Sequence, residues 1–492
     1  MRLRILSRAS DLARLQARLV GHAISASDPA VEIRYLTRTA AGDIDQTTPL
    51  PAFADKGAFT SDLSEALIRG DADIVVHSWK DLPLTSDERP ETCVAATLER
   101  GDPRDVLLIR AASVEAQPSS LTVLSSSPRR MWLIDQTLGE LLPWRVESIR
   151  CLPVRGNVPT RLRRLVEGQA DGLVVAKAAL DRLLGSGAPF EEAARQVRAA
   201  LNQCRWMVLP LRDVPAAPAQ GALAVEVGAA STALRERLQE INHAPTWRAV
   251  SRERAVLAEH GGGCHAAIGA TVLVRNYGEI TSVKARTGED AHAVWALARD
   301  RPSRPRAHAG CVWPQPKDRS QIRRQAILAA PPSSGAYWIA RADALPADWR
   351  VDGRIVWAAG GRTWRKLAAR GVWVNGCADG LGDEEAPNVD LLAGETIDWR
   401  RLTHQAAAGP GAVATYIAEA SLPEDLPSRT HFFWTSGAQA RQAFSRWPEL
   451  RQRWHASGPG RTAQTLRELL GRDAHADIWL DYDDWYRDVC QS

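Results

Sequence analysis

The first 230 residues alternate short apolar runs with amphipathic segments, and this alternation constrains the fold more than any other feature of the chain. Such a rhythm predicts layered α/β domains with largely parallel sheets. The predicted strands are 3–6, 31–36, 74–76, 106–109, 122–124 and 172–175, and the predicted helices between them include 59–68, 159–167 and 178–184. Ligands of such sheets bind at the carboxyl ends of the strands, so polar residues that follow a strand are candidates for function.

The pattern changes after residue 230. Residues 246–259 predict one long helix, and 268–274, 279–287 and 291–299 predict three antiparallel strands, which together indicate a small α+β domain. Residues 301–316 contain four prolines and predict a linker. The α/β pattern resumes near residue 326, and 13 of the 18 tryptophans lie at or after Trp295, which indicates a separate C-terminal module.

Charge and hydropathy exclude several classes of protein. The 62 basic and 58 acidic residues nearly balance, so bulk charge does not favour binding to nucleic acid. No apolar run reaches the roughly 18 residues of a membrane span, and no secretory signal is evident. The seven cysteines form no C-x-x-C pair, so neither a metal site nor a disulfide framework is predicted. We expect a cytoplasmic monomer without nucleic-acid or membrane partners.

The segment from Val75 to Pro83 is the first candidate for chemistry. A buried strand ends in His77-Ser78-Trp79-Lys80-Asp81, so Lys80 and Asp81 would lie side by side at the edge of a sheet. A polar surface turn is the alternative interpretation.

Cationic residues recur after other predicted strands. Arg129 and Arg130 follow three serines, Arg155 and Arg161 flank a Gly-Asn turn, and Arg8 follows the first strand. Guanidinium groups bind both oxygens of a carboxylate or phosphate, although paired arginines are also common at exposed helix starts.

One cysteine differs from the others in its surroundings. Cys264 follows three glycines after the long helix, so it would lie on an open loop where a thiol is reactive. A small buried residue in a turn is the alternative.

These segments together resemble hydroxymethylbilane synthase, also called porphobilinogen deaminase, over about 300 residues. The motifs that carry the resemblance are R-x-S at 8–10, D-K-G-A-F at 55–59, A-D-I-V-V-H-S-W-K-D-L-P at 72–83, E-R-G-D-P-R-D at 99–105, S-S-P-R-R at 126–130, V-R-G-N-V-P-T-R at 154–161, Q-G-A at 220–222 and G-G-C at 262–264.

The resemblance implies an α/β fold of two domains hinged like periplasmic binding proteins, followed by a small α+β domain that carries the cofactor. The implied boundaries are 1–100 with 206–230 for domain 1, 101–205 for domain 2, 231–305 for the small domain, 306–325 for the linker and 326–492 for the C-terminal α/β module.

The resemblance also implies the reaction and its residues. The family condenses four porphobilinogen molecules head to tail with loss of ammonia, on a dipyrromethane joined by a thioether to the loop cysteine, and then releases hydroxymethylbilane by hydrolysis. Asp81 would be the catalytic carboxylate and Cys264 the attachment site. The implied cofactor- and substrate-binding residues are Arg8, Ser10, Lys56, Ser78, Lys80, Ser126, Ser127, Arg129, Arg130, Arg155, Gly156, Arg161 and Arg182.

Some positions depart from the family pattern. Trp79 stands where a smaller or more flexible residue is usual, and Ala219 stands where glycine is usual, just before Gln220-Gly221. Such changes bear on substrate affinity more than on the type of reaction.

The C-terminal module carries a second, weaker resemblance. Residues 457–463, S-G-P-G-R-T-A, resemble a turn of uroporphyrinogen-III synthase, which cyclises hydroxymethylbilane. Three hypotheses therefore stand: a hydroxymethylbilane synthase, a bifunctional enzyme that also makes uroporphyrinogen III, or a non-catalytic ligand-binding protein of the same fold. The tryptophan-rich module is also suited to packing against the first module.

Overall fold

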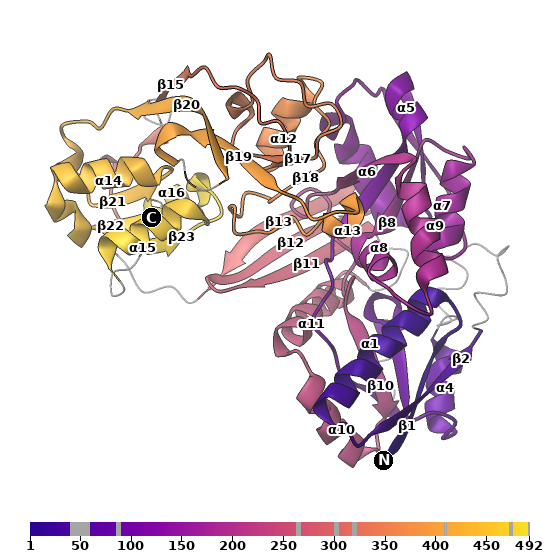
Figure 1. Cartoon of the computed structure of the whole chain (residues 1–492). Coiled ribbons are helices and arrows are strands. Elements are labelled where there is room, and N and C mark those ends of the chain that lie inside the picture. Colours follow the sequence, from indigo (N-terminus) through magenta and orange to yellow (C-terminus); the bar gives the residue numbers. More distant parts are fainter. Residues whose placement is uncertain are drawn as a thin grey trace.

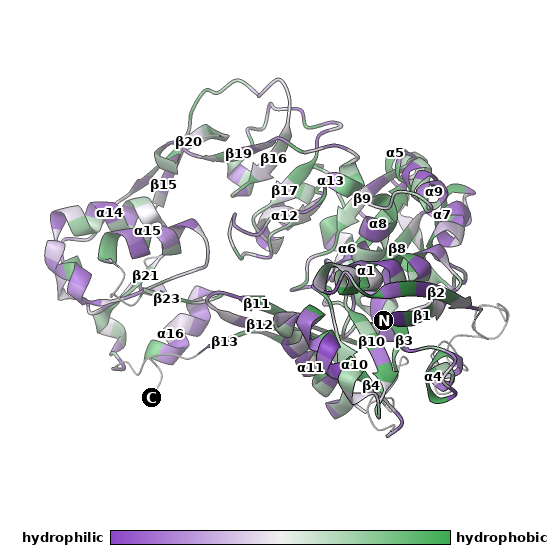
Figure 2. Ribbon diagram, turned by 60° about the horizontal axis from the view of Figure 1, so that its bottom comes forward, coloured by the Kyte–Doolittle hydropathy of each residue, from purple (hydrophilic) through white to green (hydrophobic). Residues whose placement is uncertain are grey.

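The computed structural model describes residues 1–39, 60–84, 90–261, 267–299, 305–316, 322–407, 409, 411–471 and 476–490. Figure 1 shows five sheets with helices packed around them, and it confirms the α/β class. Figure 2 shows apolar residues concentrated in strands such as β8, and hydrophilic residues along helices such as α7 and α9. Among the described residues, no helix has the length and apolar character needed to cross a bilayer.

The first two sheets share one design. Each has five strands, of which three are parallel and the fourth runs antiparallel to both of its neighbours. The first sheet, ordered β2-β1-β3-β10-β4, consists of β1 (Arg2–Arg8), β2 (Glu32–Arg38), β3 (Ile74–Ser78), β4 (Thr92–Ala96) and β10 (Leu223–Gly228). The second, ordered β7-β6-β8-β5-β9, consists of β5 (Asp105–Arg110), β6 (Ser120–Leu124), β7 (Ser148–Leu152), β8 (Gly172–Ala176) and β9 (Cys204–Val208).

Two crossover segments, residues 97–104 and 209–222, connect these sheets because β10 returns to the first sheet after the second is complete. The segment expected to return to the first domain began at residue 206, but 206–208 belong to β9 of the second sheet. The helices of the first unit are α1 (Asp11–Ser27), α4 (Ser61–Ile68) and α10 (Thr232–Leu238). Those of the second are α5 (Ala111–Ala116), α6 (Pro128–Leu141), α7 (Val158–Val166), α8 (Lys177–Leu184) and α9 (Glu191–Leu201).

The small α+β unit has one long helix and one antiparallel sheet. Its elements are α11 (Ala244–Glu259), β11 (Ala267–Arg275), β12 (Gly278–Thr287) and β13 (Asp290–Ala298). In β12, Ile280 and Ser282 are buried on one face of the strand, and Val283 and Ala285 are buried on the other.

The C-terminal half forms two lobes, which Figure 1 shows in orange and yellow. The near lobe, residues 336–407, contains β16 (Ala336–Ile339), β17 (Val356–Ala358), β18 (Gly376–Cys377), β19 (Trp399–His404), α12 (Gly361–Ala368) and α13 (Asp390–Ala393). The far lobe, residues 305–316 and 421–490, contains β14 (Val312–Trp313), β21 (His431–Trp434), β22 (Trp454–Ser457), β23 (Ala476–Ile478), α14 (Gly437–Arg446), α15 (Arg461–Leu470) and α16 (Tyr482–Cys490).

An antiparallel ladder of β15 (Ile322–Ala326) and β20 (Ala412–Ala420) connects the two lobes. The chain thus enters the far lobe at β14, crosses to the near lobe and returns. The region 306–325, expected as a linker, contains β14 and the start of β15.

The near lobe packs directly on the second sheet unit. One apolar core contains Ile109 and Leu138 of that unit together with Trp364 and Trp373 of the near lobe. The indole of Trp364 donates to the Leu141 carbonyl (3.0 Å), and Val208 N–H at the edge of β9 donates to the Asn375 carbonyl (2.8 Å). The tryptophans of the C-terminal half therefore serve in part to join it to the second unit.

Candidate functional site

The Asp81 segment lies where β3 ends. Strand β3 is buried up to His77, and the 3₁₀ turn Trp79–Asp81 follows it. Trp79 faces inward and packs edge-on against Trp247 with the ring centroids 5.2 Å apart. Because Trp79 anchors the turn, Asp81 is left exposed at the edge of the sheet. Among the described residues, no direct hydrogen bond or ion pair engages its carboxylate.

Lys80 points from this turn towards the second unit. Its Nζ donates to Gln220 Oε1 (3.2 Å). Burial lowers the pKa of Lys80 to about 8; the positive charges of Arg129 and Arg130 act in the same direction, while Asp81 and Asp105 oppose them. The ammonium group of Lys80, which follows β3 of the first sheet, therefore loses its proton more readily than an exposed lysine does.

Gln220 links the two units from the second crossover segment. Its Nε2 donates to the Pro103 carbonyl (2.7 Å) and to Asp105 Oδ1 (2.8 Å), and its Oε1 accepts from Lys80 and Arg130. Ala219, just before it, has φ +64°, which explains why glycine suits this position. The sequence interpretation noted this segment without assigning a role to Gln220.

Arg129 and Arg130 are less available than the sequence predicts. Both are buried, and both pair with Asp105, at 2.8 Å and 2.7 Å respectively. Arg129 also donates to the Pro215 carbonyl (2.8 Å), and Arg130 to the Val174 carbonyl (3.3 Å). These pairs hold the pKa of Asp105 well below its usual range, in spite of burial. Most donors of the two arginines are thus committed to the protein.

Arg161 interacts electrostatically with both Asp81 and Arg155. Burial lowers the pKa of Arg161 to about 10, helped by the charges of Arg130, Arg155 and Arg8, while Asp81 opposes the shift. The positive charges around Arg161 thus outweigh the one nearby carboxylate of Asp81 in their effect on its pKa. This group of residues is therefore suited to an anionic ligand.

Gly156 positions Arg161. The Nε of Arg161 donates to the Gly156 carbonyl (2.7 Å), and Gly156 has φ +101°. A Cβ at this position would lie 2.9 Å from Thr160 Cγ2. Asn157, next in the chain, caps α7 by accepting from Thr160 N–H (2.9 Å).

The predicted serines mainly shape the helix starts. Ser10 caps α1 and Ser127 caps α6, by accepting from backbone N–H groups at 3.4 and 3.5 Å. Ser78 exchanges hydrogen bonds with Gln16, and Ser126 Oγ donates to the Val154 carbonyl (2.8 Å). Helices α1, α6 and α7 each follow a parallel strand, so their N-termini, which favour anions, lie at the carboxyl edges of the sheets.

Arg182 contacts the crossover. Its Nη2 donates to the Gly221 carbonyl (2.6 Å), and burial lowers its pKa to about 10 against the opposing charge of Asp181. One hydrogen-bond donor of Arg182, a predicted substrate-binding residue, is thus used by a backbone carbonyl. Two other predicted residues, Lys56 and Cys264, lie outside the described residues.

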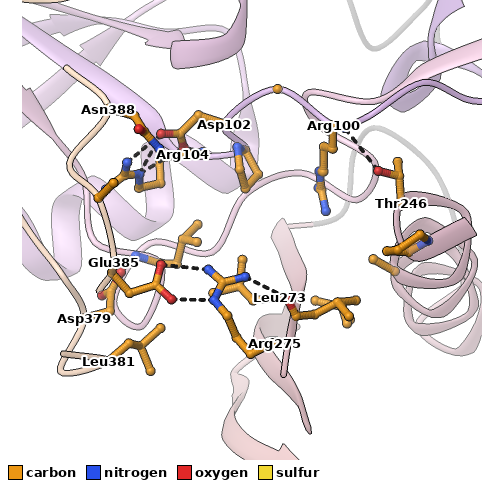
Figure 3. A pocket seen from close by; sticks show the side chains of 18 of the residues that line it. Arg100, Asp102, Arg104, Thr246, Leu273, Arg275, Asp379, Leu381, Glu385 and Asn388 are labelled. Atoms are coloured by element: carbon orange, nitrogen blue, oxygen red, sulfur yellow. Dashed lines mark hydrogen bonds and ion pairs between the residues drawn. The ribbon is translucent and has the colours of Figure 1, made fainter. Parts of the chain in front are cut away.

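A cavity of about 360 Å³ lies at the junction of the crossover, the small unit and the near lobe (Figure 3). Four of its charged lining residues are paired with one another: Arg104 binds Asp102, and Arg275 Nη2 donates to Glu385 Oε2 (2.8 Å). It is separate from the Asp81 site.

Known proteins resemble the N-terminal half. A sequence model of the porphobilinogen deaminase family, described as the dipyromethane cofactor binding domain, matches residues 3–236. The porphobilinogen deaminase of Syntrophomonas wolfei is 35% identical over 53% of this chain and 78% of its own length, and that of Acidothermus cellulolyticus is 40% identical over 55% and 75%. Among solved structures, the periplasmic aliphatic sulphonate binding protein SsuA of Escherichia coli matches 53% of this chain and 70% of its own, with 16% identity and a TM-score of 0.28.

Proposed function

The chain belongs to the porphobilinogen deaminase family, and from this premise we propose that Asp81 is the carboxylate at which its transferase reaction takes place. The activity is that of a hydroxymethylbilane synthase of tetrapyrrole synthesis, which joins porphobilinogen molecules with release of ammonia. The observation that carries the proposal is the meeting of exposed Asp81 with Lys80, Arg161 and the other cations at the edges of two sheets.

The cofactor of the family is a dipyrromethane, and the residues present fit it. Lys80 and Arg161 have lowered pKa values in a cationic surrounding, so the acidic side chains of a pyrrole would supply the missing negative charge. When bound, the cofactor supplies the pyrrole end on which the chain grows. We assign its attachment to Cys264, on resemblance alone.

Asp81 and the arginines have separate tasks in this proposal. Loss of ammonia leaves positive charge on the incoming pyrrole, and a carboxylate beside it stabilises that charge and accepts the proton released on coupling. Arg155, Arg161 and Arg8 hold the acid groups, so that the reacting carbons are positioned relative to Asp81. Arg129 and Arg130, already paired with Asp105, keep the cationic wall in place.

Intact mass and turnover test the assignment in the full chain. Asp81→Asn should retain the mass of two added pyrrole units and lose at least about a hundredfold in rate, since it keeps the shape and removes the charge. Cys264→Ala should lose both the added mass and the turnover. Asp135→Asn, an exposed change on α6, is the control. Wild-type turnover by Asp81→Asn would remove Asp81 from the mechanism.

A second activity is proposed for the C-terminal half, namely cyclisation of hydroxymethylbilane to uroporphyrinogen III. The arrangement of the two C-terminal α/β lobes supports this activity. The chain passes between the lobes twice, along β15 and β20, and the loops after the carboxyl ends of β18 and β22 are in contact. The segment 457–463, which resembles a turn of uroporphyrinogen-III synthase, leads into α15 and includes its first residues. A fused cyclase would receive its unstable substrate at high effective concentration.

Product analysis tests the second activity. Full-length protein incubated with porphobilinogen should yield the type III isomer of uroporphyrinogen. Exclusive formation of the type I isomer, which arises by spontaneous closure, would refute the cyclase. If neither product nor bound pyrrole forms, the non-catalytic binding protein becomes the better description.

A further inference from the structure

The two C-terminal lobes meet where the loop after β18 touches the turn after β22. A Cβ on Gly382 would lie 2.6 Å from the Gly460 Cα, so the two backbones are in contact and both positions need glycine. The two glycines have φ +101° and +92°. Each lies beyond the carboxyl end of a parallel strand, where α/β sheets bind their ligands.

An ion triad spans the same contact. Asp383 Oδ2 accepts from Arg401 Nη1 of β19 (2.9 Å) and from Arg461 Nε at the start of α15 (2.5 Å). One side-chain carboxylate oxygen thus serves two guanidinium groups from opposite lobes. The side chains of Asp383 and Arg401 are each 16% exposed.

The triad is short of negative charge. Burial lowers the pKa of Arg401, and the charge of Arg461 adds to this effect. The Nε of Arg401 is buried and has no hydrogen-bond acceptor among the described residues. Two arginines facing a single acid, with an unused donor, can accommodate a further carboxylate or a better-placed one.

We propose that Arg401 and Arg461 form a binding site for a carboxylate of the C-terminal half's substrate, and that Asp383 occupies this site as an internal substitute. The inference rests on the proposed cyclase, whose linear substrate carries two carboxylates on every pyrrole unit. An incoming carboxylate that forms two parallel hydrogen bonds to a guanidinium displaces Asp383, which accepts both of its bonds on one oxygen.

The loop that carries Asp383 also binds the deaminase half. Asp379 accepts N–H groups of Leu211 and Arg212 (3.0 and 3.2 Å), and the Pro387 carbonyl accepts from Arg104 (3.0 Å). Asp379 and Asn388, near the two ends of this loop (Figure 3), both have φ +51°, which is the left-handed backbone conformation. Displacement of Asp383 therefore changes a loop that also holds both crossover segments.

Titration of the full chain with uroporphyrin III, a stable cyclic molecule with the same acid side chains, tests the site. Asp383→Asn should bind the probe about tenfold more tightly, because the competing charge is gone. Arg401→Gln and Arg461→Gln should each weaken binding about tenfold, and Asp383→Asn should bring no gain when Arg461→Gln is present. The cations around Asp81 are the same in every variant, so probe bound there contributes equally.

Glu468→Gln is the matched control, because it also removes one negative charge from a side chain that pairs with an arginine. Glu468 lies on α15 and pairs with Arg441 (2.9 Å). This variant should leave probe binding unchanged. Equal binding by Asp383→Asn and the control would overturn the proposal, as would a loss of binding in Asp383→Asn as large as in the arginine variants. A chain that makes only the type I isomer would refute the cyclase, whereas the titration judges the carboxylate site.

Discussion

Asp105 pairs with Arg129 and Arg130 beside the proposed deaminase site, and removal of its charge tests whether it holds these two arginines in place. Its carboxylate is fully buried and accepts from Arg129 Nη2 (2.8 Å), Arg130 Nη2 (2.7 Å) and Gln220 Nε2 (2.8 Å). Asp105→Asn keeps the size of the side chain. It leaves two buried guanidinium groups without their anion and turns an NH₂ group towards the donors.

The expected loss of stability is large. Breaking a buried ion pair by removal of one partner costs about 3–5 kcal/mol, and here one carboxylate serves two arginines, so about 5 kcal/mol is expected. The pKa of Asp105 is depressed below its ordinary value of 3.8, so the stabilisation is complete above that value and is lost as the pH falls further. The difference between wild type and variant should therefore shrink in strong acid.

Hydrogen exchange of β5 and β6 amides measures this local stability without assuming that the whole chain unfolds in one step. Asp105→Asn should exchange these amides about a thousandfold faster or more at neutral pH. The control Asp135→Asn, which is exposed on α6, should stay within about 0.5 kcal/mol of wild type. A variant within about 1 kcal/mol of wild type would show that Asp105 does not neutralise the arginines as described.

Three further changes have defined outcomes. Burial lowers the pKa of His455 to about 4, and its Nδ1 accepts from the Trp434 indole (3.0 Å), so far-lobe stability should be complete above pH 6.5 and fall by roughly 3 kcal/mol as the pH drops to 4. Urea unfolding at pH 7.5 and 5 measures this, and His455→Gln should lose the pH dependence. Gly156→Ala should cost about 1–2 kcal/mol of stability and raise the KM for porphobilinogen, because it strains the turn that holds Arg161; an unchanged KM would contradict that positioning role. Removal of residues 306–492 should give an aggregating chain, because it uncovers the apolar face around Ile109; a soluble, fully active fragment would contradict the shared core.

Periodicity predicted much of the secondary structure. The apolar run at 74–76 lies in β3 (Ile74–Ser78), because burial on both faces of a sheet leaves a direct imprint on the sequence, and the strand predicted over 279–287 is β12 (Gly278–Thr287). The strand β14 escaped prediction, since two residues, Val312 and Trp313, carry no period. It forms only because β21 lies alongside it.

The grouping of Arg161 with Arg8, Arg130 and Arg155 was predictable, because cations that follow parallel strands meet at one edge of a sheet, whereas their roles stay a prediction. The residues that organise them were missed, because their partners are distant in sequence: Asp105 pairs with Arg129 and Arg130, and Gln220 reaches Asp105 across 115 positions. A usable signal exists in Asp105 itself. Asp105 directly precedes the apolar run 106–109, which favours burial of its carboxylate, and a buried carboxylate needs a cation or hydrogen-bond donors as partners.

The tryptophans show why composition alone could not settle the role of the C-terminal half. An indole offers a large apolar body and a single donor, which suits both the interior of a module and a contact between modules. Here Trp364 and Trp373 donate across the contact to the carbonyls of Leu141 and Trp206, and Asn375 caps the edge of β9. Separation of the near lobe from the second sheet would leave these carbonyls and the surrounding apolar side chains without partners. The second sheet and the near lobe therefore form one packed body, and hydrogen bonds from Arg104, Leu211 and Arg212 to the near lobe also tie both crossover segments to that body.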